Sequence, residues 1–345
     1  MAVIVQKFGG TSVAEESSRE RVISKVSLEL EAGNSPVLVV SAMGRRGAPY
    51  ATDTFLDMVP GASAELAALI VSCGEIVSAC IVANSLNKNG IPAKALTAYT
   101  AGIMANGPYD NAVPETIQTE NLQALIKAGI VPVVTGFQGV LPDSSIATLG
   151  RGGSDTSAVA LGAWLNAEYV DIFTDVPGVA MADPRIVPEA PYIPYLDYLS
   201  MLRLSSHGSR VLHDMSAKIA MEKNVRVRIR STFDDRPGTL IGPLDESALD
   251  GESADIVGIT VKDKDTETSL ITIVYKAGTL TAAAGEIQAR LGSQLSSLPA
   301  APGIKAASSD APDIDDPDAL VFETPKMQVK ELLQTVLKSY CRQDV

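Results

Sequence analysis

Two glycine-rich segments contain the residues whose types and spacing suit phosphate chemistry. In the first, Lys7 precedes Gly9 and Gly10, and the hydroxyl residues Thr11 and Ser12 follow. Backbone N–H groups of such a turn can bind phosphate oxygens where a helix begins, and a nearby lysine adds a point charge. In a P-loop the lysine follows the glycines, so this segment is not one. A tight turn that needs glycine for steric reasons remains the alternative.

The second segment is GRGGSDT at positions 150–156, just before an apolar helical stretch. Arg151 can donate two parallel N–H bonds to a carboxylate or a phosphate. Ser154 or Asp155 could simply cap the helix, but a cap does not explain three glycines around an arginine. Two glycine-rich loops in one sheet would bring two anions together. Phosphoryl transfer needs this arrangement, because its catalysis is mostly positioning and charge neutralisation.

Two acidic positions are further candidates. Glu75 lies within the apolar helical run SCGEIVSA, where it either faces solvent or binds a substrate ammonium, with Gly74 allowing a close approach. Thr174 and Asp175 end a strand just before Pro177-Gly178. Asp175 is either a turn residue or a nucleotide contact beyond the carboxyl end of the strand.

The chain contains only three cysteines and two histidines. Their number and spacing suit neither a disulfide framework nor a zinc site, so we expect no metal bound by protein side chains. Cys73 and Cys80 are expected to fill the core of the protein.

The elements that must position these residues alternate between strand and helix up to about residue 242. Strands are predicted at 3–8, 36–41, 93–97, 130–135, 169–174 and 225–229. Helices are predicted at 13–32, 62–87, 115–127, 156–165, 195–204 and 209–223. Continuous Val/Ile/Leu runs indicate strands covered on both faces. The pattern predicts an α/β fold, a three-layer αβα sandwich around a mostly parallel sheet.

The character of the chain changes near residue 243. Residues 243–255 are polar and acidic and are predicted to be a linker. A small α+β domain is predicted at 256–345, after a catalytic domain at 1–242. Its predicted strands are 256–261, 269–275 and 319–323, its predicted helices are 281–291 and 328–341, and its Ser/Ala/Pro/Asp-rich excursion is 297–317.

Composition excludes several classes of partner. The 345-residue chain has a net charge of −13, which gives it no general attraction for nucleic acid or anionic lipid. Neither a signal peptide nor the roughly 20 consecutive apolar residues of a membrane span are evident. We therefore expect a cytoplasmic protein.

Taken together, these segments resemble the aspartate kinases of the amino-acid kinase superfamily, over positions 1 to about 242. The matching motifs are VIVQKFGGTSVA, VLVVSAMG, SCGEIVSA, TLGRGGSDTSAVAL, IFTDVPGV, ADPRIVP, HGSRVLH and VRVRIRST. The resemblance implies the amino-acid kinase fold with an ACT-like C-terminal domain. It also implies transfer of the ATP γ-phosphoryl group to the β-carboxylate of L-aspartate, with Mg²⁺ held mainly by the ATP phosphates, in a homodimer or higher homo-oligomer.

The resemblance also assigns roles to individual residues. Lys7 and Asp155 would be catalytic. The residues assigned to aspartate are Ser41, Thr52, Glu75 and Arg151. The residues assigned to ATP are Lys7, Gly9, Gly10, Thr11, Thr174, Asp175, Arg185 and Arg210.

Several features depart from the family pattern. Ala180 replaces a frequent tyrosine, Arg210 replaces the usual lysine, and Asp214 replaces a proline. Only residues 243–345 follow the kinase region, enough for one ACT-like module where the family normally has two. A kinase for another small carboxylate, or a catalytically weak regulatory homologue, therefore remains an alternative.

Overall fold

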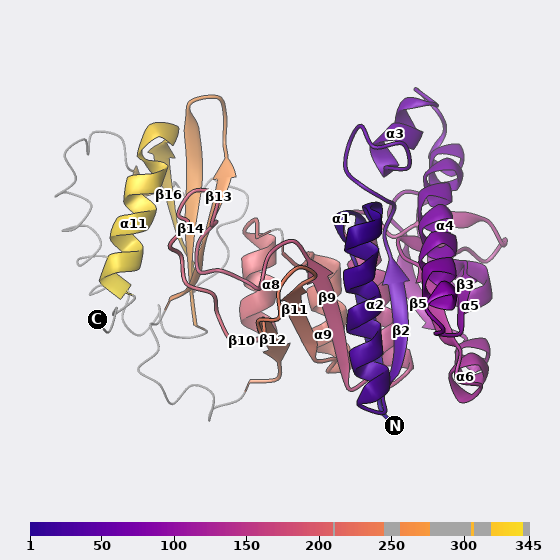
Figure 1. Ribbon diagram of the computed structural model, residues 1–345. Helices are drawn as coiled ribbons and strands as arrows, with labels where there is room; N and C mark the ends of the chain where they lie inside the picture. The colour runs from indigo at the N-terminus through magenta and orange to yellow at the C-terminus, as the bar shows by residue number, and fades with distance from the viewer. Residues whose placement is uncertain (210, 245–255, 277–304, 307–318, 341–345) are drawn as a thin grey trace. The chain divides into compact units, whose positions relative to one another are not determined.

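The computed structural model describes residues 1–209, 211–244, 256–276, 305–306 and 319–340 (Figure 1). The chain divides into two compact units. The first comprises Met1–Gly178 and Met215–Gly242, and the second comprises Val179–Asp214 and Pro243–Val345.

The first unit is built on a mostly parallel sheet with the strand order β12-β11-β9-β1-β2-β6-β3. Every neighbouring pair is parallel except β11 and β12. The buried run Val37–Val40 shows why continuous apolar strands form here, since both faces of the sheet are covered. The strands are β1 (Val3–Phe8), β2 (Ser35–Val40), β3 (Ala93–Leu96), β6 (Val131–Thr135), β9 (Tyr169–Thr174), β11 (Val227–Ser231) and β12 (Thr239–Gly242).

Helices cover both faces of this sheet, which confirms the predicted three layers. On one face, α2 (Glu16–Glu31) and α4 (Ala64–Lys88) bury apolar side chains against Phe8 and Phe173. On the other face, α7 (Gly153–Trp164) packs directly on β1 and β9. The remaining helices of this unit are α1 (Gly10–Ala14), α3 (Thr52–Asp57), α5 (Ala98–Ala101), α6 (Glu120–Lys127) and α9 (Asp214–Lys223).

A second small sheet in this unit was not predicted. Its order is β5-β4-β7-β8, and its strands are β4 (Ile103–Asn106), β5 (Val113–Ile117), β7 (Gln138–Val140) and β8 (Ile146–Thr148). The predicted helix 115–127 is therefore wrong at its start. Val113–Ile117 pairs antiparallel with β4 instead, and the helix begins only at Glu120. Short apolar runs do not distinguish strand from helix, so the pairing partner decides.

Other helix boundaries differ from the prediction for local reasons. The helix predicted at 13–32 is divided at Glu15, whose backbone is extended (φ −106°, ψ 158°). The helix predicted from 195 begins as α8 (Tyr198–Ser206), because Asp197 caps it by accepting the N–H of Ser200 at 3.0 Å. Residues Tyr195–Asp197 form the short strand β10.

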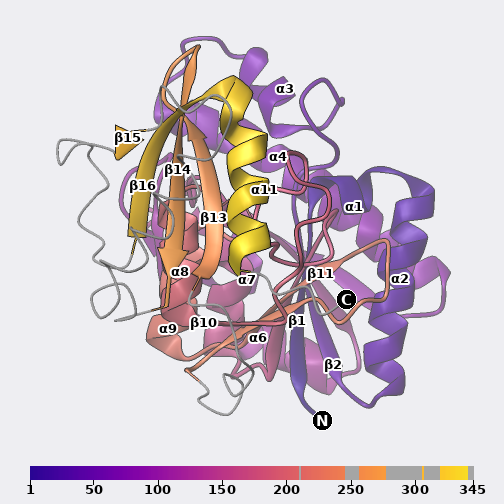
Figure 2. The ribbon, with the colours of Figure 1, turned by 90° about the vertical axis from the view of Figure 1, so that its left-hand side faces the viewer.

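The second unit contains an antiparallel sheet with the order β13-β14-β16-β15, packed against α11 (Figure 2). Ile271 and Ile273 of the sheet share one core with Leu332 and Val336 of the helix. The predicted C-terminal strands and last helix are confirmed, whereas 281–291 and 297–317 lie outside the described residues. The elements are β13 (Ile256–Asp263), β14 (Thr268–Tyr275), β15 (Lys305–Ala306), β16 (Ala319–Pro325), the 3₁₀ turn η2 (Lys326–Gln328) and α11 (Val329–Tyr340).

The segment between β9 and α9 belongs to this second unit. Ala182, Val187 and Ala190 are buried in its apolar core. The Ile259 N–H donates to the Met181 carbonyl at 2.7 Å. Part of the region with kinase-like sequence therefore folds together with the C-terminal residues.

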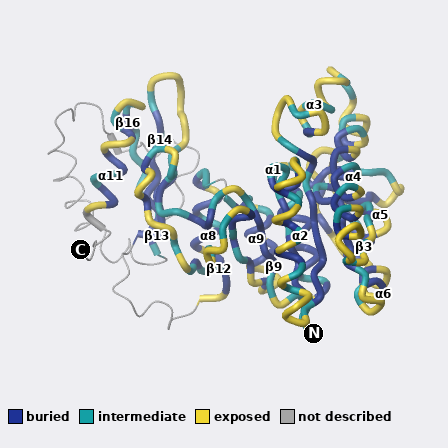
Figure 3. Tube along the Cα trace, in the orientation of Figure 1, coloured by how far each residue is buried: buried dark blue, intermediate teal, exposed yellow. Residues whose placement is uncertain are grey.

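The exposed side of α4 overturns one sequence prediction. Cys73 and Cys80 were expected in the core, but both are exposed on this helix. Buried and exposed residues alternate along α4 (Figure 3). The helix is also long and apolar enough to pass as a membrane span by composition, yet half of its apolar window is buried inside the protein. Its buried side, with Val82 and Leu86, packs on the sheet. It is therefore a core helix with one apolar side left exposed.

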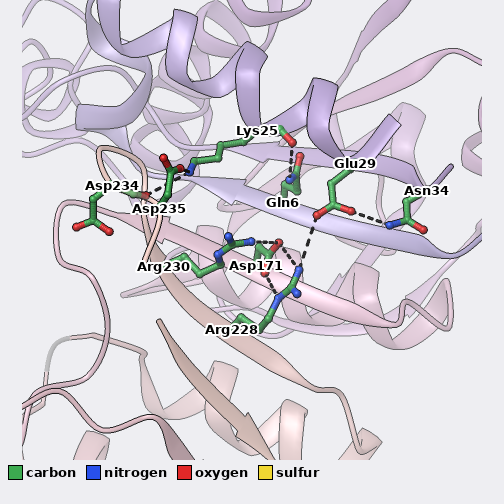
Figure 4. A network of polar contacts seen from close by, with 9 residues as sticks. All are labelled: Gln6, Lys25, Glu29, Asn34, Asp171, Arg228, Arg230, Asp234 and Asp235. Carbon is green, nitrogen blue, oxygen red and sulfur yellow. Dashed lines mark hydrogen bonds and ion pairs between the residues drawn. The ribbon is translucent and has the colours of Figure 1, made fainter. Parts of the chain in front are cut away.

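A polar row crosses the α2 face of the sheet (Figure 4). Strand register places Gln6, Asp171 and Arg228 side by side on β1, β9 and β11. Asp171 is completely buried and accepts two bonds from Arg228, at 2.5 and 2.8 Å. The Arg230 guanidinium lies 3.6 Å from the same carboxylate, and Glu29 of α2 lies 3.8 Å from Arg228. The buried Asp171 carboxylate thus joins β9 to β11, and Arg228 extends the contact to α2.

Removing this carboxylate should destabilise the fold strongly. Asp171→Ala leaves Arg228 partly buried without its main partner, and we expect a loss of about 3–5 kcal/mol in the free energy of unfolding, measured in urea. Glu222→Gln is the control, because Glu222 forms only an exposed pair with Lys218. That variant should lose less than about 0.5 kcal/mol. Equal losses in the two variants would contradict the structural role of Asp171.

Candidate active site

Three parallel strands end together at the edge of the sheet where the first glycine-rich segment lies. β1 lies between β2 and β9. The chain runs from β1 to one side of the sheet and returns later to the other side. Open α/β sheets bind their ligands at such a switch in direction, beyond the carboxyl ends of the strands. The segments following β1, β2 and β9 contain the predicted site residues.

An ion pair joins the two glycine-rich loops. The Lys7 ammonium on β1 lies 2.7 Å from the Asp155 carboxylate in the first turn of α7, and both side chains are about nine-tenths buried, at 11% and 10% exposure. The two groups are not aligned as a hydrogen bond, so the contact is one of charge. Asp155 is not the cap of α7, since that position is Gly152 and no side chain caps the helix. The capping interpretation of Ser154 and Asp155 is therefore wrong.

The first glycine turn packs tightly on the loop that follows β2. A Cβ atom on Gly10 would lie 2.5 Å from the Ala42 carbonyl oxygen and 2.6 Å from that of Gly44. The Gly44 N–H donates to the Gly10 carbonyl at 3.0 Å. Gly10 is thus required sterically, as the alternative interpretation held. Because α1 has only five residues, phosphate binding here would depend on the backbone amides and Lys7 more than on a helix dipole.

The second glycine loop is also constrained by its neighbours. Gly150 and Gly152 have left-handed backbone angles, with φ of 68° and 70°. A Cβ on Gly153 would lie 2.7 Å from the Phe137 ring. Arg151 lies between Gly150 and Gly152 and is exposed. No described carboxylate lies within ion-pair distance of its guanidinium. The loop therefore presents a guanidinium for an anionic ligand.

Glu75 is a buried acid beside this edge. Its residue is 2% exposed, and Oε1 accepts the Ala42 N–H at 3.0 Å. Oε2 has no hydrogen-bond partner among the residues that the structure describes. Burial raises the pKa of Glu75 to about 8, although the bond from Ala42 opposes the shift. The solvent-facing interpretation is therefore wrong, and the free oxygen can accept a bond from a ligand.

The loop between β2 and α4 contains the other two residues expected to bind substrate. Ser41 is held at its start, where its N–H donates to the Phe8 carbonyl at 3.2 Å. Thr52 begins α3, directly after the cap residue Ala51. A Cβ on Gly74 would lie 2.8 Å from that of Ala42, so glycine allows α4 to approach this loop. Ser41, Thr52 and Glu75 thus lie on segments that contact one another.

The end of β9 carries an interaction that the sequence did not reveal. The Arg45 guanidinium lies 2.5 Å from the Asp175 carboxylate, although both side chains are largely exposed. Thr174 donates to the other Asp175 oxygen at 3.1 Å. Sequence spacing could not pair residues 130 positions apart. The pair connects the loop after β2 with the end of β9.

The remaining predicted residues are placed differently. Arg185 belongs to the second unit, where it pairs with Asp183 at 2.6 Å. Arg210 lies outside the described residues. Thr232 was also missed by sequence analysis. Its hydroxyl lies 2.7 Å from that of Ser12, and both residues are buried. Its place in the VRVRIRST motif is the one signal that could have indicated it.

The geometry combines cations for anions with an acid for a cation. Lys7 and Arg151 provide positive charge at two glycine-rich loops, and Glu75 provides a buried acceptor. Guanidinium and ammonium groups bind carboxylates and phosphates, and a carboxylate binds an ammonium.

Comparison with known proteins identifies the family of this sequence. The model of the amino acid kinase family matches residues 2–231. Aspartokinase 1 of Bacillus subtilis is 42% identical over 245 residues, covering 70% of this chain and 61% of the relative. An aspartate kinase of Pseudomonas putida is 39% identical over 254 residues, covering 72% and 61%. The chain thus spans about three fifths of the length of these relatives.

Solved structures agree with the fold. Aspartate kinase from Synechocystis has a TM-score of 0.61 at 28% identity, covering 99% of this chain and 57% of that one. E. coli aspartokinase III in complex with aspartate and ADP has a TM-score of 0.65 at 21% identity, covering 98% and 83%. At that identity the second likeness concerns the fold alone.

The buried carboxyl of Glu75 should make stability depend on pH. Its pKa is about 8 in the folded chain against an ordinary 4.5. Between these values the folded chain retains a proton that the unfolded chain loses. The free energy of unfolding should therefore fall as pH rises through this range, by up to about 1.4 kcal/mol per pH unit. Glu75→Gln cannot ionise and should show a flatter dependence.

Urea unfolding between about pH 5 and pH 8 would measure this difference. Glu222→Gln, which replaces an exposed acid, is the control and should follow the wild-type slope. If Glu75→Gln follows it too, the pKa of Glu75 is not raised.

Proposed function

The chain belongs to the amino acid kinase family, and we propose that it transfers the γ-phosphoryl group of ATP to the β-carboxylate of L-aspartate. The product would be 4-phospho-L-aspartate, and this reaction would be the first step towards lysine, threonine and methionine. The observation that carries this proposal is the Lys7–Asp155 ion pair, which joins the two glycine-rich loops. The family match and the aspartokinase relatives support it.

The chemistry requires little more than positioning and charge. A carboxylate is already a nucleophile, so no strong base is needed to activate it. The Lys7 ammonium would neutralise the phosphoryl group during transfer, since it is poised between the two loops. Asp155 would keep this ammonium in place and orient the substrate.

Aspartate would be bound by complementary charge. Arg151 would hold a carboxylate with its two N–H donors, and the free oxygen of Glu75 would accept from the α-ammonium. Ser41 and Thr52, on the loop that contacts Glu75 through Ala42, would complete the site. A buried carboxylate oxygen without a partner favours a substrate with a free ammonium over an N-acylated one.

ATP would lie across the ends of β1 and β9. Gly9, Gly10 and Thr11 would bind its phosphates, and Thr174 and Asp175 would border the nucleotide. Arg185 and Arg210 are proposed as further ATP contacts. Mg²⁺ would be held mainly by the phosphates. In the described part of the chain no cluster of three or more His, Cys, Asp or Glu residues could hold a metal ion.

The second unit is proposed to contain a single ACT-like module at 256–345, after a linker at 243–255. Its antiparallel sheet packed on α11 supports this interpretation. We further propose a cytoplasmic homodimer or higher homo-oligomer, as the family resemblance implies.

Loss of the Lys7 ammonium should abolish turnover. In a hydroxylamine-trapping assay with ATP and aspartate, Lys7→Ala should reduce kcat by about 100-fold or more, because a charge directed at the transition state is lost. Lys218→Ala, at an exposed position of α9, is the control and should keep wild-type kcat. Wild-type turnover no higher than that of Lys7→Ala would refute the proposed activity.

Glu75 should determine how aspartate affinity depends on pH. Binding an ammonium requires the ionised carboxylate, so below a pKa of about 8 binding must expel a proton. The KM for aspartate should therefore fall as pH rises towards 8. In Glu75→Gln the KM should be about 10- to 100-fold higher and nearly independent of pH, because a charged hydrogen bond is lost.

N-acetyl-aspartate tests the same contact from the side of the substrate. It lacks the ammonium, so the wild type should use it poorly, and Glu75→Gln should narrow the gap in kcat/KM between the two substrates. A wild type that uses both equally would show that Glu75 does not bind the ammonium.

A further inference from the structure

We propose that Thr232, just after β11, is a positioning residue that holds the glycine turn after β1 in line with the end of β9. This inference rests on the proposed function, because it concerns how two halves of the ATP site are kept in register. Neither sequence motif nor family resemblance assigned a role to this residue.

Thr232 contacts both halves at once. Its hydroxyl shares a 2.7 Å hydrogen bond with Ser12 of α1. Its N–H donates to the carbonyl of Thr174, the last residue of β9, at 2.9 Å. Thr232 is 1% exposed and Ser12 is 0% exposed, so neither hydroxyl can exchange its partner for solvent. A single residue therefore connects the helix that follows the first glycine turn to the end of β9.

Ser12 transmits this contact to the glycine turn. Its N–H donates to the Gly9 carbonyl at 2.9 Å, and the Gly9 N–H donates to the Phe173 carbonyl at 3.3 Å. The helix α1 has only five residues and no side-chain cap, so little within the helix fixes its position. The Ser12 hydroxyl is thus a main anchor for the turn from the side of β11.

The segment that carries Thr232 is itself held firmly. Figure 4 shows the Lys25 side chain of α2 reaching Asp234 and Asp235. The Lys25 ammonium donates to the Asp234 carbonyl at 3.2 Å and to the Asp235 carboxylate at 2.5 Å. The Ser231 hydroxyl accepts the Phe233 N–H at 3.0 Å. Because the segment is fixed on both sides of Thr232, that residue acts as a rigid support.

The energetic argument concerns an unpaired buried hydroxyl. Valine has the shape of threonine but no hydroxyl, so Thr232→Val leaves the Ser12 oxygen buried without its partner. The turn can regain a partner only by moving. A shift of about 1 Å in a positioned group can cost about 100-fold in rate. The proposed aspartate contacts Glu75 and Arg151 lie on α4 and in the second glycine loop, and the Ser12–Thr232 bond involves neither of them. The effect on aspartate binding should therefore be smaller than the effect on ADP binding.

The test compares four single variants and one double variant of the full chain with the wild type. Thr232→Val and Ser12→Ala each remove one hydroxyl of the pair, and Thr232→Ser keeps the bond. Thr260→Val is the matched control. It also loses a buried threonine hydroxyl, which donates to the His207 carbonyl at 2.6 Å in the second unit.

We expect Thr232→Val to weaken ADP binding, measured by calorimetry, by about 10-fold and to lower kcat by a similar factor. The KM for aspartate should change by less than about twofold. Thr232→Ser should match the wild type. Thr260→Val should lose thermal stability without losing ADP affinity. Combining Ser12→Ala with Thr232→Val should weaken ADP binding little more than either change alone.

Other results would overturn the proposal. Thr232→Val with unchanged ADP affinity, or with equal losses for ADP and aspartate, would mean a merely structural hydroxyl. Failure of Thr232→Ser to restore binding would mean that the bond is irrelevant. ADP binding can be measured without aspartate turnover. A wild type that binds ADP but does not phosphorylate aspartate therefore refutes the proposed function and leaves this inference to the Thr232→Val comparison, whereas absence of ADP binding refutes both.

Discussion

A lysine ammonium and a carboxylate that are both about nine-tenths buried lose several kcal/mol of hydration each, and only close contact with each other can offset the loss. Lys7 and Asp155 meet this condition at 2.7 Å. The contact requires β1 to be the central strand at the switch of the sheet, and it requires α7 to begin directly over that strand. The left-handed glycines before α7 bring its first turn into this position. The order of the parallel strands and the glycine loops together bring these two charged groups into contact.

Local charges decide whether an acidic protein can bind the anions proposed as its substrates. A net charge of −13 repels ATP and aspartate at long range. Among partly buried groups, however, nearby charges outweigh distant ones that solvent screens. Lys7 and Arg45 each face a carboxylate, of Asp155 and Asp175, whereas the exposed Arg151 faces none among the described residues. The overall charge is therefore compatible with the proposed substrates, because the relevant field is local.

The sequence predicted those parts of the fold that depend on local patterns. Continuous apolar runs identified β2 and β6, because a strand covered on both faces shows no polar alternation. Sequence-based prediction failed where a residue distant in the chain determines the local structure. Val113–Ile117 is a strand because β4 pairs with it. Cys73 is exposed because α4 is apolar on more than one side and only one side packs on the sheet. In the site, Lys7 and Asp155 were found by motif, whereas the contacts of Arg45 and Thr232 bridge long separations that no spacing rule covers.

Glu75 shows why a binding site can weaken the protein that contains it. In the absence of ligand its second oxygen is buried without a described partner, and burial raises the pKa of the group to about 8. The first oxygen accepts the Ala42 N–H, but no described contact accounts for the second oxygen. The ammonium of a ligand would bind this oxygen and favour the ionised form of Glu75. A ligand without an ammonium would leave the oxygen buried and unpaired, and this difference in free energy would select between the two ligands. The unpaired oxygen therefore argues for a substrate with a free amino group, which composition and fold alone do not specify.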